Sequence, residues 1–279
     1  ATVEAAAPEA EEGFDVDGET VAPEAVPAWV AAHLASDQRA GLSVAGTWAR
    51  GTGDASGVAV AAPDGSAAWI DLQTLTPEGE AALGDWLEDA ARPKAMHDAK
   101  GPIEALGARG WTLGGLTSDT QLAAYLVKPD QRTYHLDDLV LRHLKRELSG
   151  AAPADGQGML DFGGDADEKA AGQEMVRATA VRDLAVSLDE QVAAIGGTEL
   201  LADIELPLID VLAHEKLAGF TVAVQASTSV LSNRGAAGKA IAKKPDVIFH
   251  RAVVVSGEAD IDLGKGYRVN LDGTRPLLE

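Results

Sequence analysis

The side chains that could hold a metal ion or move a proton in this sequence are carboxylates and histidines, because the chain contains no cysteine. A thiolate metal site, a cysteine nucleophile and a disulfide are therefore excluded. The histidines show none of the close spacings, such as His-x-x-x-His, that metal sites use; they are His33, His97, His135, His143, His214 and His250. We interpret them as surface or half-buried side chains and predict no metal ligand among them.

Two short motifs that would indicate other chemistry are incomplete. The segment Gly235-Ala236-Ala237-Gly238-Lys239-Ala240 is similar to a phosphate-binding loop. However, Asn233 occupies the position of the first glycine, and Ala240 that of the Ser or Thr that binds Mg²⁺. No Gly-x-Ser-x-Gly sequence is present to form a nucleophile elbow. We predict a basic loop or a helix start at 235–240, and no hydrolase triad.

The charge of the chain argues against nonspecific binding of nucleic acid. Lys and Arg number 23 against 44 Asp and Glu, which gives a net charge of −21, whereas binding to phosphates needs a cationic face. Residues 1–24 hold eight acids and no base, and residues 226–279 hold eight bases and six acids. We expect 1–24 to be a disordered, solvated linker. Without an apolar run of membrane-spanning length or a secretory signal, the chain is predicted to be soluble and cytoplasmic.

The apolar pattern predicts strands first and helices afterwards. Short apolar runs at 42–45, 57–61 and 67–72 indicate three consecutive antiparallel strands. Thr76 and Asp119 have the residue type and position of helix N-caps. The other predicted elements are a strand at 94–97, helices at 102–109, 136–144, 170–195 and 198–214, with Pro207 starting or kinking the last, a loop at 149–165, and strands within 246–255 and 267–270. This order predicts a mixed α/β layer structure.

Two stretches carry a resemblance to a known family. Residues 119–126 read Asp-Thr-Gln-Leu-Ala-Ala-Tyr-Leu and are followed by a leucine-patterned segment; residues 205–213 read Glu-Leu-Pro-Leu-Ile-Asp-Val-Leu-Ala. Through them, residues 41–212 resemble the 3′–5′ exonuclease-like domain of the DNA polymerase I family, the family A polymerases. The resemblance implies an α/β fold with a ribonuclease H-like mixed sheet flanked by helices.

The resemblance also implies how the chain is divided. An acidic linker at 1–24 would precede the exonuclease-like domain at 25–222. The unrecognised extension at 223–279 is either a small β module or the translation of a shifted reading frame.

Active members of that family hold two divalent ions with four carboxylates, and the resemblance shows where those carboxylates would lie. The Asp-x-Glu of the first strand corresponds to Gly46-Thr47-Trp48, and the Asp of the second motif to Pro102. The third motif, Tyr-x-x-x-Asp, corresponds to 179–183 and keeps Asp183 while Thr179 replaces the Tyr. One ligand of four remains, so we assign no catalytic residue and expect no bound metal and no cofactor. Mg²⁺ would be needed only by an unexpectedly active site.

Other residues near these positions have simpler interpretations. Asp54 and Asp98 are conceivable substitute ligands, whereas Asp183 is interpreted as a solvated or salt-bridged residue beside Arg182. Trp48 is expected to be buried against the long helix at 170–195, where it would fill the space of the missing metals.

Three functions follow from the resemblance. The first is a degenerate, inactive domain of a replication and repair polymerase, which spaces and supports the polymerase and 5′ nuclease domains of the parent protein and binds DNA weakly if at all. The second is an active metal-dependent 3′–5′ exonuclease with rearranged ligands. The third is a standalone protein-interaction module. The sequence contains no Asp-Tyr-Ser-x-Ile-Glu, Arg-x-x-x-Lys or His-Asp-Glu motif of a polymerase active site.

Overall fold

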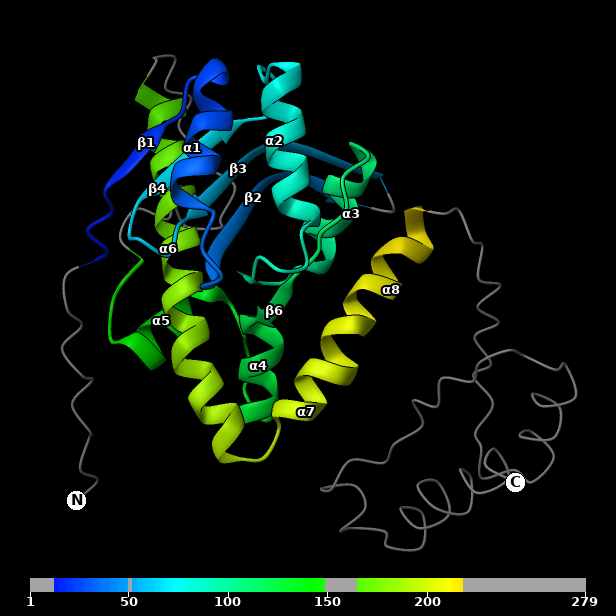
Figure 1. Ribbon diagram of the computed structural model, residues 1–279. Coiled ribbons are helices and arrows are strands. Elements are labelled where there is room, and N and C mark those ends of the chain that lie inside the picture. Colours follow the sequence, from blue (N-terminus) through cyan, green and yellow to red (C-terminus); the bar gives the residue numbers. More distant parts are fainter. Residues whose placement is uncertain (1–12, 50–51, 149–164, 218–279) are drawn as a thin grey trace, which may run out of the picture. The chain divides into compact units, whose positions relative to one another are not determined.

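The computed structural model describes residues 13–49, 52–148 and 165–217 (Figure 1). The chain divides into two units, residues 1–220 and 221–279, and all described residues belong to the first. The predicted extension at 223–279, most of the predicted loop at 149–165 and the first half of the predicted linker lie outside the described residues.

The described residues form one six-stranded sheet in the order β1-β4-β3-β2-β5-β6. Its strands are β1 (Gly18–Thr20), β2 (Ala40–Ala49), β3 (Thr52–Ala61), β4 (Ala67–Asp71), β5 (Lys94–Met96) and β6 (Leu116–Asp119). The three central strands pair antiparallel, whereas β5 pairs parallel to β2, β6 parallel to β5 and β1 parallel to β4. The predicted fold class, a mixed sheet of ribonuclease H-like order, is confirmed.

Helices cover both faces of this sheet (Figure 1). They are α1 (Val26–His33), α2 (Pro77–Glu88), α3 (Lys100–Ala108), α4 (Thr120–Val127), α5 (Leu136–Leu144), α6 (Asp165–Ala194), α7 (Thr198–Leu200) and α8 (Leu206–Leu217), with a 3₁₀ turn η1 (Pro23–Ala25) and a π-helical segment η2 (Leu201–Glu205). Every residue from Val58 to Ala61 of β3 is fully buried, as expected for a strand with helices on both sides.

Alternation along the strands divides the core between the two faces. Ala59 and Ala61 of β3 pack with Met175 and Ala178 of α6. Val58 and Val60 point the other way, into the larger cluster that includes residues of α1, α2 and α3. The contact between β2 and α6 is so close that a Cβ at Gly41 of β2 would lie 2.0 Å from the Ala178 carbonyl oxygen.

The predicted helix starts agree with the hydrogen bonds of the structure. Thr76 Oγ1 accepts from the Gly79 N–H at 3.1 Å at the start of α2. Asp119 accepts from the N–H groups of Gln121 and Leu122 at the start of α4. Pro207 is the second residue of α8, directly after the π-helical segment η2. The proline thus starts a new helix, because its ring and missing N–H are tolerated only in the first turn.

One expectation is wrong for the part of it that the structure describes. Within the predicted linker at 1–24, Gly18–Thr20 forms the edge strand β1, and Val21, just after it, is buried. The strand is stabilised by backbone pairing with β4, which needs no apolar side chains. A Cβ at Gly18 would lie 2.7 Å from Met175 Sδ, so the glycine allows this strand to approach α6.

Candidate functional site

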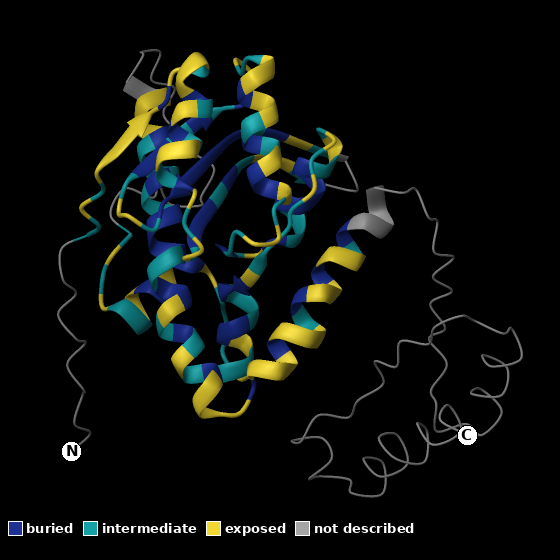
Figure 2. Cartoon of the chain, viewed as in Figure 1, coloured by how far each residue is buried: buried dark blue, intermediate teal, exposed yellow. Residues whose placement is uncertain are grey.

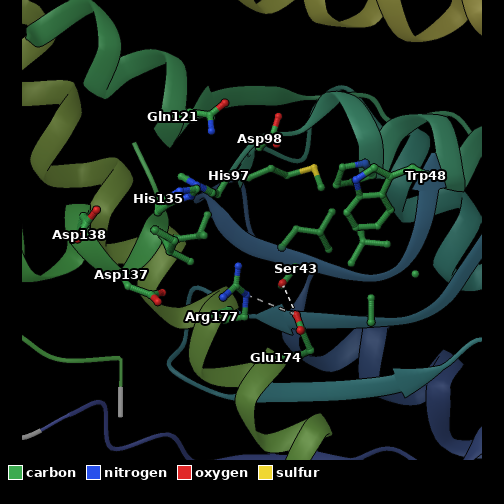
Figure 3. A pocket seen from close by; sticks show the side chains of 18 residues that line it. Ser43, Trp48, His97, Asp98, Gln121, His135, Asp137, Asp138, Glu174 and Arg177 are labelled. Atoms are coloured by element: carbon green, nitrogen blue, oxygen red, sulfur yellow. Dashed lines mark hydrogen bonds and ion pairs between the residues drawn. The ribbon is translucent and has the colours of Figure 1, made fainter. Parts of the chain in front are cut away.

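A pocket of about 680 Å³ lies where β2, β5 and the first turns of α3, α4 and α5 meet α6. Its polar lining is shown in Figure 3 and consists of Ser43, His97, Asp98, Gln121, His135, Asp137, Asp138, Glu174 and Arg177. Apolar side chains from β2, β5 and α6 complete the lining. The pocket therefore combines residues that are up to 139 positions apart in the sequence, from Leu42 to Val181.

The structure brings together three of the four positions at which the family's carboxylates were expected. Gly46, Trp48 and Pro102 all line the pocket, as does the suggested substitute Asp98. Asp183 does not: its Oδ1 accepts a hydrogen bond from Arg182 Nε at 3.0 Å, and Arg182 Nη1 also donates to the Ala62 carbonyl at 2.7 Å. Asp54, the other suggested substitute, is exposed on β3 and also lies off the pocket.

Trp48 lies against a different helix from the one expected. Its indole covers the first turn of α3, where a Cβ at Gly101 would be 2.2 Å from Trp48 Cδ1. The side chain is only half-buried. Alternation along β2 explains the difference. Gly41 and Ser43 face α6, so the even-numbered Trp48 points to the other face.

One serine of β2 and two charged side chains of α6 form a small bonded cluster in the pocket (Figure 3). Ser43 Oγ donates to Glu174 Oε2 at 2.5 Å. Arg177 Nε lies 3.9 Å from the same oxygen, one helical turn further along α6. Sequence reasoning missed all three residues. Positions 174, 177 and 181 share a face by helical spacing, but only the packing of α6 on β2 turns that face into the pocket.

His97 is held as a neutral side chain at the end of β5. Thr120 Oγ1 donates to the Met96 carbonyl at 3.3 Å and lies 2.8 Å from His97 Nδ1. The Thr120 hydroxyl therefore links the His97 ring to the end of β5. Burial lowers the pKa of His97 to about 4, and the nearby charges of Arg177 and His135 lower it further in the same direction.

Asp119 bonds to the starts of two helices and does not line the pocket. The carboxylate is 2 % exposed. Its Oδ2 accepts from the Ala99 N–H at 2.8 Å, and its Oδ1 accepts from Gln121 and Leu122, so it bonds the first turns of both α3 and α4. Burial raises the pKa of Asp119, and these three N–H groups oppose that shift. Asp119 thus caps α4 as predicted and also bonds to the start of α3.

The residues of this pocket do not fit a pair of divalent metal ions. Mg²⁺ requires oxygen ligands close to octahedral positions, and glycine, tryptophan and proline side chains supply none. Among the described residues, no three His, Cys, Asp or Glu side chains lie close enough together to hold a metal ion. Glu174, which lies on α6 and contacts β2, is already bonded to Ser43 and paired with Arg177.

The arrangement of sheet and helices defines a ribonuclease H-like exonuclease fold. The crystal structure of Escherichia coli RNase D superposes with a TM-score of 0.55 over 81% of this chain and 55% of that chain, at 15% sequence identity. That identity is low enough for the likeness to concern the fold alone.

Sequence similarity identifies the family within this fold. A family profile described as the DNA polymerase I, ribonuclease H-like domain matches residues 52–150. DNA polymerase I of Mycobacterium tuberculosis is 48% identical over 231 residues, which is 83% of this chain and 26% of that protein. A structure of the POL domain of Pol1 from M. smegmatis, in complex with DNA primer-template and dNTP, matches with a TM-score of 0.60 at 42% identity, over 71% of this chain and 31% of that one.

The described part of the chain is therefore an exonuclease-like, ribonuclease H-like domain of the kind found in DNA polymerase I. The chain spans about a quarter of the length of the curated relatives that it matches (26%). In the described part of the chain, no helix has both the length and the apolar character needed to cross a membrane.

Proposed function

We propose that this domain has lost exonuclease activity and acts as a structural support within a DNA polymerase I that takes part in DNA replication and repair. The observation that carries the proposal is the pocket lining, in which Gly46, Trp48 and Pro102 supply no metal ligand and Arg177 adds a cation. In the parent protein the domain would space and support the polymerase and 5′ nuclease parts. The proposed location is the cytoplasm, where bacterial DNA is replicated.

Two-metal hydrolysis explains why this lining is incompatible with activity. The ions orient the attacking water and stabilise the leaving 3′ oxygen, so the carboxylates that hold the ions are part of the reaction itself. An arginine can neutralise Glu174 without a metal, but it cannot generate a hydroxide from water. The Ser43, Glu174 and Arg177 cluster is therefore interpreted as a structural contact at the edge of the pocket, which holds α6 on β2.

A second candidate, a rearranged but active exonuclease, depends on the carboxylates that remain at the pocket. Asp98 follows β5, Asp137 and Asp138 lie in the first turn of α5, and Glu174 lies on α6. A metal ion that drew them together would have to break the contacts of Glu174 with Ser43 and Arg177. This cost favours the inactive interpretation.

A nuclease assay distinguishes the two candidates. A single-stranded DNA oligonucleotide labelled at its 5′ end is incubated with the chain and Mg²⁺ or Mn²⁺, beside an active 3′–5′ exonuclease as positive control. We expect no shortening from the 3′ end above background, because loss of the metal clamp removes several orders of magnitude in rate.

Matched variants show what a positive result would mean. Shortening that is abolished by Asp98→Ala or Glu174→Ala, but not by Asp183→Ala, would overturn the proposal and place activity in the pocket. Shortening that is abolished only by Asp183→Ala would also overturn it and would locate the active metal site outside the pocket.

A further inference from the structure

The chain enters the sheet through residues 13–17, a segment without helix or strand that we call the strap. Its side chains alternate: Phe14 and Val16 are half-buried, whereas Asp15 and Asp17 are exposed, as in an extended segment with one side against the protein. The strap leads into β1, and the yellow colour of that edge strand in Figure 2 shows that its three residues are exposed. Two apolar side chains therefore attach the strap before the backbone pairing of β1 begins.

The two half-buried side chains of the strap contact different parts of the domain. Val16 packs against the small core cluster that includes Met175 of α6. Phe14 packs against the large core cluster that includes Val140 of α5. Arg146, just beyond the end of α5, places its Cζ 5.1 Å from the centre of the Phe14 ring, a distance at which a cation is attracted to an aromatic face. The strap thus connects the edge strand β1 to α6 and to the end of α5.

The backbone turns directly after α5 and brings Arg146 to Phe14. Lys145 ends the helix with a φ of 59°, in the left-handed region that glycine ordinarily occupies at this position. Lys145 Nζ donates to the Arg142 carbonyl at 2.9 Å. A residue other than glycine keeps such a conformation only where surrounding contacts hold it. The contact between Arg146 and Phe14 is one of these.

The helix α5 depends on its neighbours for its position. It has only nine residues, and a helix of that length is marginal by itself in water. Leu139 and Val140 are fully buried, and Gln191 Nε2 of α6 lies 3.0 Å from His143 Nδ1. Residues 136–138, in the first turn of α5, line the pocket, so a movement of α5 changes that wall of the pocket.

We propose that the strap is a latch for α5. With Phe14 in contact with Arg146, the helix is held on α6 and the pocket keeps its α5 wall; when Phe14 leaves, α5 detaches more often. The strap is suited to such a release, because a surface segment with few buried contacts opens at a low cost in free energy. The inference does not depend on whether the pocket is active.

The absence of cysteine allows a single buried thiol to report the detachment of α5 in the full chain. Val140→Cys places this thiol in α5 and Val60→Cys places it in β3, both at fully buried positions. The rate at which dithiobis(nitrobenzoate) labels each thiol measures how often its surroundings open. With Phe14→Ala added, we expect labelling at position 140 to be at least about fivefold faster, because the packing of the ring and its contact with the cation are lost. Labelling at position 60 should be unchanged.

Further variants test the contact itself. Arg146→Met removes the charge and keeps an unbranched side chain, so it should also speed labelling at position 140. Combined with Phe14→Ala it should add nothing, because both substitutions remove the same contact. The matched control is Asp15→Ala, which changes an exposed residue of the strap and should leave both rates unchanged. If Val140→Cys does not fold, hydrogen exchange of the backbone amides of α5 and α3 in the cysteine-free chains gives the same comparison.

Three results would overturn the inference. The first is labelling or exchange in α5 that is no faster in the Phe14→Ala chain. The second is an equal gain at positions 140 and 60, which would mean general destabilisation of the fold. The third is an Arg146→Met chain in which α5 opens as it does in the unmodified protein.

Discussion

At the scale of single residues, His97 shows that burial, without any catalytic role, can account for a strongly shifted pKa. Its Nδ1 bonds to Thr120, and its pKa is lowered to about 4 mainly by burial. A perturbed histidine in a pocket is often a sign of acid-base chemistry. Here the neutral ring completes a hydrogen-bonded connection between the end of β5 and the start of α4.

The pKa of His97 predicts a loss of stability in acid. In the unfolded chain the pKa lies near 6.5, and in the folded protein near 4. Between these values the unfolded state binds more protons, so the free energy of unfolding falls as the pH falls from about 6.5 to 4. The free energy of unfolding differs between pH 7 and pH 4.5. We expect that difference to be smaller by on the order of 2 kcal/mol in the His97→Gln variant. Urea denaturation at both pH values measures it, and an unchanged difference would contradict the assignment.

The residues of the candidate site could be predicted only where a short stretch of sequence is enough to identify them. Gly46, Trp48 and Pro102 were assigned through the family resemblance, which aligns short family motifs with 46–48 and 98–102, and the structure places all three at one pocket. The bond between Ser43 and Glu174 joins residues 131 positions apart. It depends on how α6 is rotated and shifted along β2, which is set by packing around Gly41 and not by any local pattern.

At the scale of elements, the sequence predicts best where one residue type has one structural role. The N-caps Thr76 and Asp119 and the proline of α8 each marked a helix start. Strands β1 and β6 escaped prediction, because Gly18–Thr20 and Leu116–Asp119 have almost no apolar alternation. Both are edge strands, and backbone pairing with one neighbouring strand fixes their positions. The sequence alone does not show which strand that neighbour is.

Asp119 provides the test of element-scale stability. Asp119→Ala removes acceptors from three backbone N–H groups and leaves the Ala99 N–H without its partner in a buried position. We expect a loss of about 2–4 kcal/mol in the free energy of unfolding. The matched control is Asp71→Ala, which removes one turn hydrogen bond, to the Gln73 N–H, and should cost less than about 1 kcal/mol. Equal losses in guanidinium denaturation would show that Asp119 does not join α3 to α4.

At the scale of the whole molecule, electrostatics opposes the DNA binding that the family resemblance implies. The resemblance implies a groove for a single strand, but residues 1–225 of this chain carry a net charge of −23, since residues 226–279 contribute +2. Many of the described cations are also engaged. Lys94 is fully buried, and five arginines are paired with carboxylates: Arg39, Arg92, Arg109, Arg177 and Arg182.

This balance predicts weak binding of DNA. Nonspecific affinity comes almost entirely from contacts between cations and phosphates, so we expect binding weaker than the ~10⁻⁴–10⁻⁶ M typical of nonspecific DNA-binding proteins at physiological salt. Residual affinity should come from the cationic cluster Arg234, Lys239, Lys243 and Lys244, which lies in the stretch 226–279 that has a net positive charge. Fluorescence anisotropy with a labelled single strand, at two salt concentrations, compares the chain with a variant in which these four residues are alanine. Sub-micromolar binding that survives the substitution would show that the groove still holds DNA, and the role of a purely structural support would then have to be abandoned.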